Sequence, residues 1–270
     1  MPASSSSAST ILVAVGLTLV AFGLLWRRQL RTRNATSVDA AWAMAIGLLG
    51  TGAAVFGDGS PVQRLVAGLM ALAWSARLAW LLLRHRVLGD AREDGRYRAM
   101  REHWGERAPQ HFFWFYQAQA VAALAFALPF WFLATFVQDT LLPVQYAGLG
   151  VVIAAQWAEG TADRQLAAHR ADPQQRGRTC RSGLWRYSRH PNYFFEWLSW
   201  CGIALVASPA AGWWALVQPA VMFVLVRFVS GVPFTELQAL KSRGDDYRRY
   251  QRETNAFVPW PPRGSRGADA

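Results

Sequence analysis

The sequence predicts an all-α protein with about seven transmembrane helices. Apolar residues make up 53% of the 270 residues and come in blocks of about 17–25 residues, the length that spans roughly 30 Å of hydrocarbon. Charged residues make up only 17%, below the roughly 25% usual in soluble domains, and nearly all lie between the blocks. No periodic strand pattern is present. These observations argue against an ordinary soluble domain.

Seven apolar blocks are the predicted spans, and their flanking residues explain where they end. A run of arginines closes the first block, GDGSP separates the second from the third, and SPAAG separates the sixth from the seventh. Long charged connectors cover residues 84–110 and 159–190. The first block lacks a basic segment before it and a cleavage pattern after it, so we expect a retained helix and not a signal peptide. The predicted spans are residues 10–26, 38–56, 63–83, 112–137, 141–157, 192–207 and 213–229.

The charges predict how the chain is oriented in the membrane. The formal net charge of +11 is carried by 28 basic residues, all but one of them arginine. All except Arg64 and Arg77 lie after the first, third, fifth and seventh blocks, or near the end of the seventh. Because basic connectors stay in the cytoplasm, we expect the N-terminus outside and the C-terminus inside. This topology, with anionic membrane lipids as partners, explains the charge without a nucleic acid.

We expect one membrane-embedded domain over residues 1–270, with a cofactor-binding C-terminal half at about 159–260. Cys180 and Cys201 have neither metal-ligand spacing nor a disulfide framework, so no metal site is predicted. The stretch GLLGTG at 47–52 lies inside an apolar block and follows no strand. It therefore predicts close helix packing and not nucleotide binding. The sequence contains no P-loop, HExxH or GxSxG motif.

Besides Arg64, four ionisable residues lie at or within the predicted spans, where such groups are costly and are therefore functional candidates. Asp39 opens the second span, and a place in the cap of a helix at the interface is its alternative role. Arg77 and Arg227 lie near the ends of the third and seventh spans, and the alternative for both is a side chain that reaches the membrane surface. For Glu196, in the sixth span, the alternative is a favourable interaction with the helix dipole.

The segment GLWRYSRHPNYFFEW, residues 183–197, has a basic first half and an apolar, aromatic second half. Pro191 predicts the first turn of a helix, so Asn192 and Glu196 lie on one face. Backbone N–H groups at the helix start, beside a basic segment, predict a mouth that receives an anion. An amide and a carboxylate just inside suit a carboxamide or polar ring, which favours a nucleotide cofactor from the cytoplasm. An interfacial anchor without a ligand is the alternative.

This segment, continued as GLWRYSRHPNYFFEWLSWCGIAL, resembles the C-terminal signature of the steroid 5-alpha-reductase family, and more closely its bacterial branch, a domain of unknown function. The resemblance covers nearly the whole chain. Isoprenylcysteine and phospholipid methyltransferases, which bind S-adenosylmethionine, are more distantly similar through an RHPxY segment. The other matching stretches are SVDAAW at 37–42, EDGRYRAMREHWG at 93–105, ADRQLAAHRADPQQRG at 162–177, RFVSGVPFTE at 227–236 and YRRYQRETNAFVPW at 247–260.

The resemblance implies a seven-helix membrane fold that binds NADPH in a cytoplasm-facing cavity. It also implies reduction of a carbon–carbon double bond in a lipophilic enone, steroid-like or isoprenoid. Asn192 and Glu196 would address the nicotinamide end, and the arginines would pair with phosphates. The positions implied for cofactor binding are Asp163, Arg170, Tyr187, Asn192, Glu196, Trp200 and Arg227. Three further residues of the segment complete the predicted site: Arg189, His190 and Tyr193.

The chain departs from the steroid reductases in the groups that polarise the substrate carbonyl, a glutamate on the second helix and a tyrosine on the third. Here the second span offers Asp39, and the third offers Arg77 but no tyrosine. A proton donor is required, because the enolate left by hydride delivery must be protonated. Asp39 is the candidate for polarisation or proton supply, and Arg77 for stabilising the developing negative charge.

Three hypotheses about function follow, and the leading one is a membrane NADPH-dependent reductase. The others are an S-adenosylmethionine-dependent methyltransferase of a lipid or prenylated substrate, and a non-enzymatic protein that binds lipid or sterol. Related methyltransferases often carry paired glutamates after the last helix, whereas this chain has only Glu236 there, which favours the reductase. The arginine-rich, lysine-poor composition suggests a GC-rich bacterial genome, and hence the bacterial inner membrane.

Overall fold

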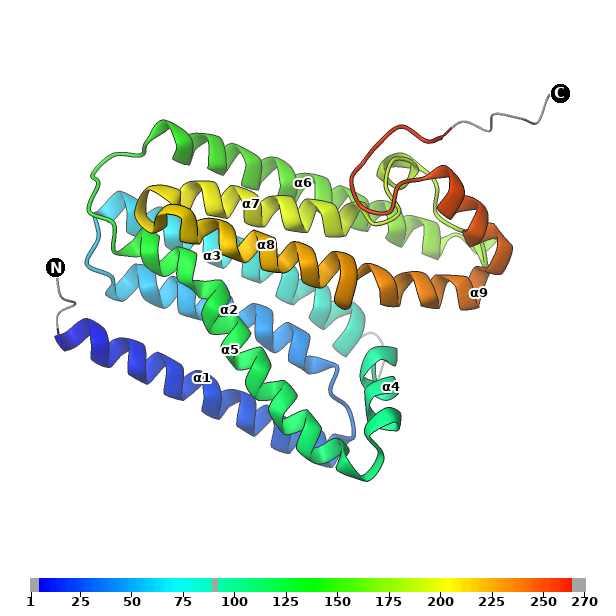
Figure 1. Ribbon diagram of the computed structural model, residues 1–270, viewed down its shortest axis with the longest axis horizontal. Helices are drawn as coiled ribbons and strands as arrows, with labels where there is room; N and C mark the ends of the chain where they lie inside the picture. The colour runs from blue at the N-terminus through cyan, green and yellow to red at the C-terminus, as the bar shows by residue number, and fades with distance from the viewer. Residues whose placement is uncertain (1–4, 89–91, 264–270) are drawn as a thin grey trace. The chain divides into compact units, whose positions relative to one another are not determined.

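A computed structural model describes residues 5–88 and 92–263, and within these ranges every regular element is a helix. The predicted all-α fold is therefore confirmed (Figure 1). Two π-helical segments, Leu83–Val87 and Leu225–Val229, continue α3 and α8. The α-helices are α1 (Ser5–Thr32), α2 (Ser37–Phe56), α3 (Pro61–Leu82), α4 (Gly95–Trp104), α5 (Ala108–Ala134), α6 (Pro143–Ala171), α7 (Pro191–Ala211), α8 (Val217–Val224) and α9 (Val232–Glu253).

Five helical segments in the described ranges are long and apolar enough to cross a membrane, which supports a membrane protein. They are Ser9–Thr32, Ser37–Phe56, Pro61–Leu82, Gly95–Ala134 and Pro191–Glu253. The last of these segments contains two of the predicted spans, 192–207 and 213–229. The predicted span 141–157 lies in α6, which is not among the five. The number of seven spans therefore stays a prediction.

Both predicted connectors contain helix, because charge does not end a helix. The predicted connector 159–190 begins inside α6, which continues to Ala171. Residues 159–171 are rich in good helix formers and contain no proline, so the backbone stays helical where the apolar run ends. The first connector contains α4, whose start is capped by the Asp94 side chain, which accepts a hydrogen bond from the N–H of Arg96.

The chain divides into two compact units, which are described separately. The first comprises residues 1–142 and 209–211, and the second comprises residues 143–208 and 212–270. The first contains α1 to α5, and the second contains α6, most of α7, α8 and α9. That both units belong to one membrane-embedded domain stays a prediction.

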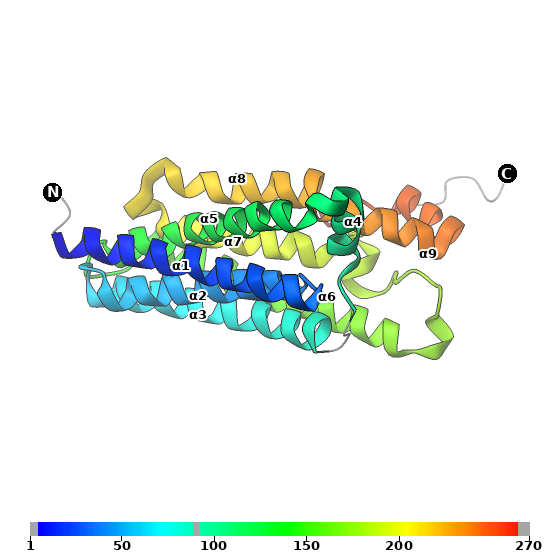
Figure 2. The same ribbon diagram turned by 90° about the horizontal axis from the view of Figure 1, so that it is seen from below.

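In the first unit, α1, α2, α3 and α5 pack side by side, and small residues bring α2 and α3 close together (Figure 2). A Cβ atom added at Gly47 would lie 2.2 Å from Ser75 Oγ, and one at Gly50 would lie 2.5 Å from Ala71 Cβ. Ser75 Oγ donates a hydrogen bond across the same contact to Ala43 O at 2.8 Å. The GLLGTG stretch therefore serves close helix packing, as predicted.

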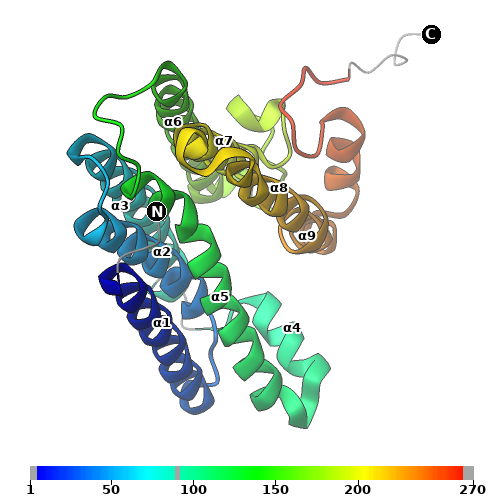
Figure 3. The same cartoon turned by 60° about the vertical axis from the view of Figure 1, so that its left-hand side comes forward.

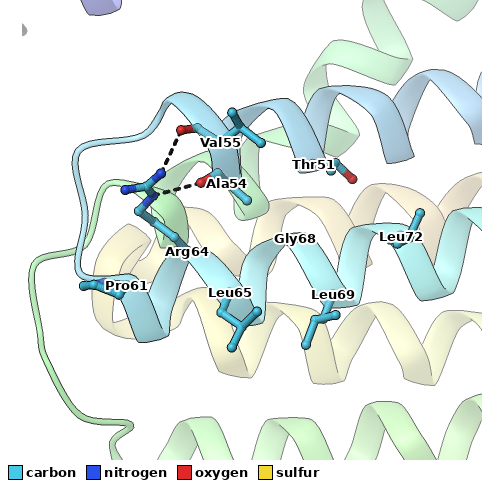
Figure 4. Close-up of a pocket in the computed structure, with 9 residues that line it drawn as sticks. All are labelled: Thr51, Ala54, Val55, Pro61, Arg64, Leu65, Gly68, Leu69 and Leu72. Atoms are coloured by element: carbon cyan, nitrogen blue, oxygen red, sulfur yellow. Dashed lines mark hydrogen bonds between the residues drawn. The ribbon is translucent and has the colours of Figure 1, made fainter.

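Arg64 caps the end of α2 from the start of α3. Its guanidinium donates hydrogen bonds to Ala54 O at 2.8 Å and Val55 O at 2.7 Å (Figure 4). These carbonyls lie in the last turn of α2, where no further helical N–H follows. An open apolar groove runs alongside, between α2 and α3, and its lining includes Leu65 and Leu69, which are both exposed. Exposed leucines are what a lipid-facing helix surface requires.

The α4 helix packs against the N-terminal part of α5 in the same unit (Figure 3). Tyr97 of α4 is buried in one cluster with Phe112 and Tyr116 of α5 and with Phe22 of α1. The connector after α3 thus returns to the helical bundle and places its charged side chains against the N-terminal end of α2.

In the second unit, α6 and α7 are antiparallel and pack closely (Figure 1). A Cβ atom added at Gly148 would lie 2.8 Å from Gly202 O and from the backbone N of Val206. One turn before Gly148, the buried Gln145 donates a hydrogen bond to Val206 O at 3.1 Å. Contact of backbone with backbone holds the two helices in a fixed register, which positions the side chains discussed next.

The segment after α9 folds back onto the basic segment that precedes α7 (Figure 1). The backbone N–H of Arg189 donates to Asn255 O at 2.8 Å, and that of Trp260 donates to Tyr187 O at 2.9 Å. The hydroxyl of Tyr250, in the last turn of α9, bonds to the carbonyls of Trp185 and Ser188. We call residues 254–263 the C-terminal strap.

Candidate functional site

The basic segment ends where α7 begins. Pro191 is the first residue of α7, and His190 before it has a non-helical φ of −140°, which confirms the predicted helix start. Ser188 Oγ accepts a hydrogen bond from the N–H of His190 at 3.1 Å and donates one to Phe257 O at 2.7 Å. Side-chain and backbone contacts therefore hold the mouth of α7 before any ligand is considered.

The predicted amide and carboxylates lie on α6 and α7. Asn192 Nδ2 donates a hydrogen bond to Asp163 Oδ1 of α6 at 3.2 Å. One turn deeper, Glu196 is only 8% exposed, and its Oε1 accepts a hydrogen bond from Trp200 Nε1 at 3.0 Å. Four of the predicted site residues are thus held in direct contact in two hydrogen-bonded pairs on two packed helices.

Glu159 of α6 is a further buried carboxyl of this region, with an exposure of 4%. A hydrogen bond from Gln156 Nε2 to Ser199 Oγ, at 2.9 Å, joins the same two helices as the bond between Asn192 and Asp163. It lies seven residues before Asp163 on α6 and seven residues after Asn192 on α7. Because the helices are antiparallel, Glu159 lies between these two bonds, level with Glu196. Two buried carboxyls on facing helices are costly unless they serve function or are paired.

Arg189, predicted to contact a phosphate, is largely engaged by the protein itself. Its Nε donates to Glu236 Oε1 at 2.7 Å, and its Nη1 donates to Gln251 O at 3.0 Å and to Thr254 O. The side chain is 11% exposed, and the nearest charge is a carboxylate. Arg189 therefore joins α7, α9 and the C-terminal strap, and a phosphate would compete with these contacts.

His190 and Tyr193 form the aromatic part of the mouth. Their rings stack with centroids 5.5 Å apart and an angle of 8° between the planes. Burial lowers the pKa of His190 below its ordinary value of 6.5, and the Glu236 carboxylate offsets only part of this effect. The Tyr193 hydroxyl lies 3.2 Å from Thr235 Oγ1 of α9. The imidazole is thus held neutral, beside a pair of hydroxyl groups.

Three predicted residues lie at the periphery. Tyr187 is 41% exposed, between the short helical turn 183–186 and α7. Arg170 is exposed in the last turn of α6. Arg227 lies in the π-helical segment after α8, with its guanidinium carbon 5.1 Å from the ring centroid of Phe228.

Asp39, the predicted proton donor, lies in the first turn of α2 at the centre of a second charged cluster. Its Oδ2 accepts hydrogen bonds from Arg96 Nη2 at 2.6 Å and Arg86 Nη1 at 3.2 Å. Its Oδ1 accepts a hydrogen bond from the Tyr97 hydroxyl. Burial alone would raise the pKa of the neighbouring Asp94, but Arg96 and Arg86 reverse this effect and lower it. Both oxygens of Asp39 therefore accept hydrogen bonds, so the carboxyl holds two arginines and a tyrosine in place around the start of α2.

Arg77, the other predicted catalytic residue, lies in the same unit as Asp39. It is half-buried and lies in the second half of α3, six residues before the start of the π-helical segment that carries Arg86. The neighbouring Trp74 is buried and packs edge-on against Trp42 of α2, with ring centroids 5.9 Å apart.

The model of one protein family, described as a protein of unknown function (DUF1295), matches residues 25–254. The chain belongs to the DUF1295 family. The matched range contains every predicted site residue, from Asp39 to Arg227. No curated protein and no solved structure matches the chain.

In this DUF1295 protein, reasoning from the sequence missed the partners of both clusters. Tyr97 and Arg96 belong to the quoted EDGRYR stretch, and their place in a predicted connector concealed their contact with Asp39. Glu159 is the first residue of a predicted connector, and this position hides its burial in α6. A carboxylate within an Ala-rich helical run is the signal that identifies it.

Proposed function

We propose that this protein is a membrane reductase that uses NADPH to reduce a carbon–carbon double bond in a lipophilic enone, steroid-like or isoprenoid. The observation that carries the proposal is the contact of Asp163 with Asn192, beside buried Glu196, at the N-terminal end of α7. The resemblance of this segment to the steroid 5-alpha-reductase family supports the same proposal.

The residues present fit the carboxamide end of a nicotinamide. A carboxamide both donates and accepts hydrogen bonds, and the cluster offers carboxylate oxygens on Asp163 and Glu196 and amide N–H groups on Asn192. The hydrogen bond from Trp200 fixes the position of one oxygen of Glu196. When bound, NADPH supplies a hydride. The chain's own residues would bind and orient the ring.

The phosphates are assigned to arginines outside the helix. Arg186 lies exposed directly before α7, and Arg170 lies exposed at the end of α6. Each presents a planar fork of donors that matches phosphate oxygens. Arg227 is kept as a further candidate at the end of α8. Arg189 contributes to the mouth mainly by holding the C-terminal strap.

In the first unit, we propose that Asp39 acts as a positioning residue. It holds Arg86, Arg96 and Tyr97 against the start of α2. Arg77 is retained for stabilising the negative charge that develops on the substrate. We place the protein in the bacterial inner membrane, with the basic connectors and the cofactor site on the cytoplasmic side.

A thermal-shift titration of the purified protein with NADPH, NADH and S-adenosylmethionine tests the proposal. A ligand at about 100 times its dissociation constant stabilises the native state by about 2.7 kcal/mol. We expect stabilisation by NADPH that is lost in Asn192→Ala and Glu196→Gln. The control Glu106→Gln changes an exposed carboxylate in the first unit and should leave the shift intact.

The other outcomes separate the alternatives. A shift with S-adenosylmethionine alone would identify a methyl-donor site and a lipid or prenyl methyltransferase. No shift with any of the three cofactors would favour a non-enzymatic lipid- or sterol-binding protein. A response to NADPH that Asn192→Ala and Glu196→Gln leave unchanged would move the cofactor site away from α7.

A further inference from the structure

Two fully buried polar side chains of the first unit have hydrogen-bonding atoms without a partner. Tyr116 of α5 is 0% exposed, and its hydroxyl has no hydrogen-bond partner. Gln29 of α1 is 1% exposed, and its Nε2 has none. Burying a polar group without a hydrogen-bond partner is costly, so native proteins rarely retain one without a reason.

Contacts place these two groups in one region. Gln29 Oε1 accepts a hydrogen bond from Arg101 Nη2 of α4 at 3.1 Å. The guanidinium of Arg101 lies 4.6 Å from the ring centroid of Phe112 on α5. Phe112 and Tyr116 are four residues apart and therefore lie on one face of α5. Phe22 of α1, seven residues before Gln29, is in the same buried cluster as Tyr116.

A third group without a partner lies next to this cluster. Trp42 of α2 packs against the cluster that contains Tyr116, and its indole N–H has no hydrogen-bond partner. The indole and amide N–H groups are donors, and the Tyr116 hydroxyl is a donor as well. Helices α1, α2 and α5 thus each contribute one donor to a largely aromatic cluster, whose charged neighbours Arg101 and Glu93 are paired with each other.

We propose that Tyr116, Gln29 and Trp42 form the hydrogen-bonding site for the carbonyl oxygen of an apolar ligand bound among α1, α2 and α5. Donors without acceptors call for a ligand atom that only accepts, and a carbonyl oxygen is such an atom. The ligand should be uncharged, because the neighbouring Arg101 is already paired with Glu93 at 2.7 Å. Identifying this ligand as the substrate rests on the proposed reductase function, whereas its binding does not.

The test is a binding assay without any nucleotide, so that it fails independently of the reductase proposal. The probes are β-ionone, an isoprenoid enone, and the analogue in which CH₂ replaces its C=O group. Binding to the detergent-purified protein is followed by quenching of tryptophan fluorescence. We expect the wild type to bind β-ionone about tenfold more tightly than the analogue, since tenfold corresponds to about 1.4 kcal/mol and hydrogen bonds to one oxygen supply this amount.

Variants assign the preference to its residues. Tyr116→Phe removes one of the three donors, and Gln29→Glu removes a second while keeping an oxygen for Arg101. Each should reduce the preference for β-ionone at least threefold. The control Tyr146→Phe alters an exposed tyrosine of the second unit and should leave it unchanged. No saturable binding of β-ionone, equal binding of both probes, or a preference that survives Tyr116→Phe would overturn the inference.

A ligand-free measurement checks the premise. If the Tyr116 hydroxyl lacks a partner in the free protein, Tyr116→Phe should raise the melting temperature, because phenylalanine buries no polar atom. A lower melting temperature would mean that the hydroxyl is bonded in the free protein, by a buried water for example, and would also overturn the inference.

Discussion

Replacing Gly47 by alanine is expected to destabilise the first unit, whereas the same change at Gly52 of the same helix is not. A Cβ atom at Gly47 would lie 2.2 Å from Ser75 Oγ and 2.4 Å from Ser75 Cβ, far inside van der Waals contact. Ser75 has little room to rotate away, because its hydroxyl is bonded to Ala43 O at 2.8 Å and the residue is buried. At Gly52 nothing lies within 4 Å of the added atom.

The magnitude follows from two opposing terms. Overpacking of this kind costs about 1–3 kcal/mol, and replacing glycine by alanine inside a helix returns at most about 1 kcal/mol. The Gly47→Ala variant should therefore be about 1–3 kcal/mol less stable than Gly52→Ala, which should equal the wild type or be up to about 1 kcal/mol more stable.

The assay is unfolding in mixed micelles with an increasing fraction of SDS, followed by tryptophan fluorescence and circular dichroism. Both variants are measured beside the wild type in the same detergent. Equal midpoints for Gly47→Ala and Gly52→Ala would refute the close packing of α2 on α3.

The remaining predictions concern the charged clusters and the C-terminal strap. Asp39→Asn should lower the free energy of unfolding by about 2–3 kcal/mol in the same assay, because Arg86 and Arg96 lose their shared counter-charge. If this loss is electrostatic, high salt should reduce the difference in stability between Asp39→Asn and the wild type. Tyr250→Phe should lower the free energy of unfolding by about 1–2 kcal/mol and speed proteolysis after α9, because the Tyr250 hydroxyl bonds two carbonyls of the basic segment. An unchanged rate of cleavage would contradict the attachment of the C-terminal strap to that segment. His190 has a lowered pKa, so the unfolded chain takes up the proton first. Stability should hold above about pH 6.5 and fall as the pH drops below it, and His190→Gln should flatten this dependence.

Patterns that depend on local chemistry were predictable. The start of α7 followed from Pro191, because proline fixes the first helical turn and excludes helix from the residue before it. The close packing near Gly47 followed from small residues within an apolar helix. Both inferences need only neighbours in the sequence, so they do not depend on how distant segments meet.

Contacts between distant segments were not predictable. The Arg96 and Tyr97 side chains lie 57 and 58 residues from Asp39, in a stretch whose charge indicated only an exposed connector. The length of the apolar run also misplaced the end of α6, because helix formers continue beyond the run to Ala171. The length of an apolar run indicates how thick a hydrocarbon layer the segment can cross. The end of a helix depends instead on residues such as glycine and proline that break the helical backbone.

The arginines illustrate the same limit at the candidate site. From the sequence, every arginine near Pro191 is an equal candidate for a phosphate. In the structure these arginines differ in the hydrogen bonds that their guanidinium groups already make. Arg189 binds Glu236 and the carbonyls of Gln251 and Thr254, whereas Arg186 is exposed. An arginine that must release three internal bonds gains little from an anion, since binding replaces hydrogen bonds that it already has. The affinity for a phosphate should therefore depend more on Arg186 than on Arg189, while the fold of the C-terminal strap should depend more on the side chain of Arg189 than on that of Arg186.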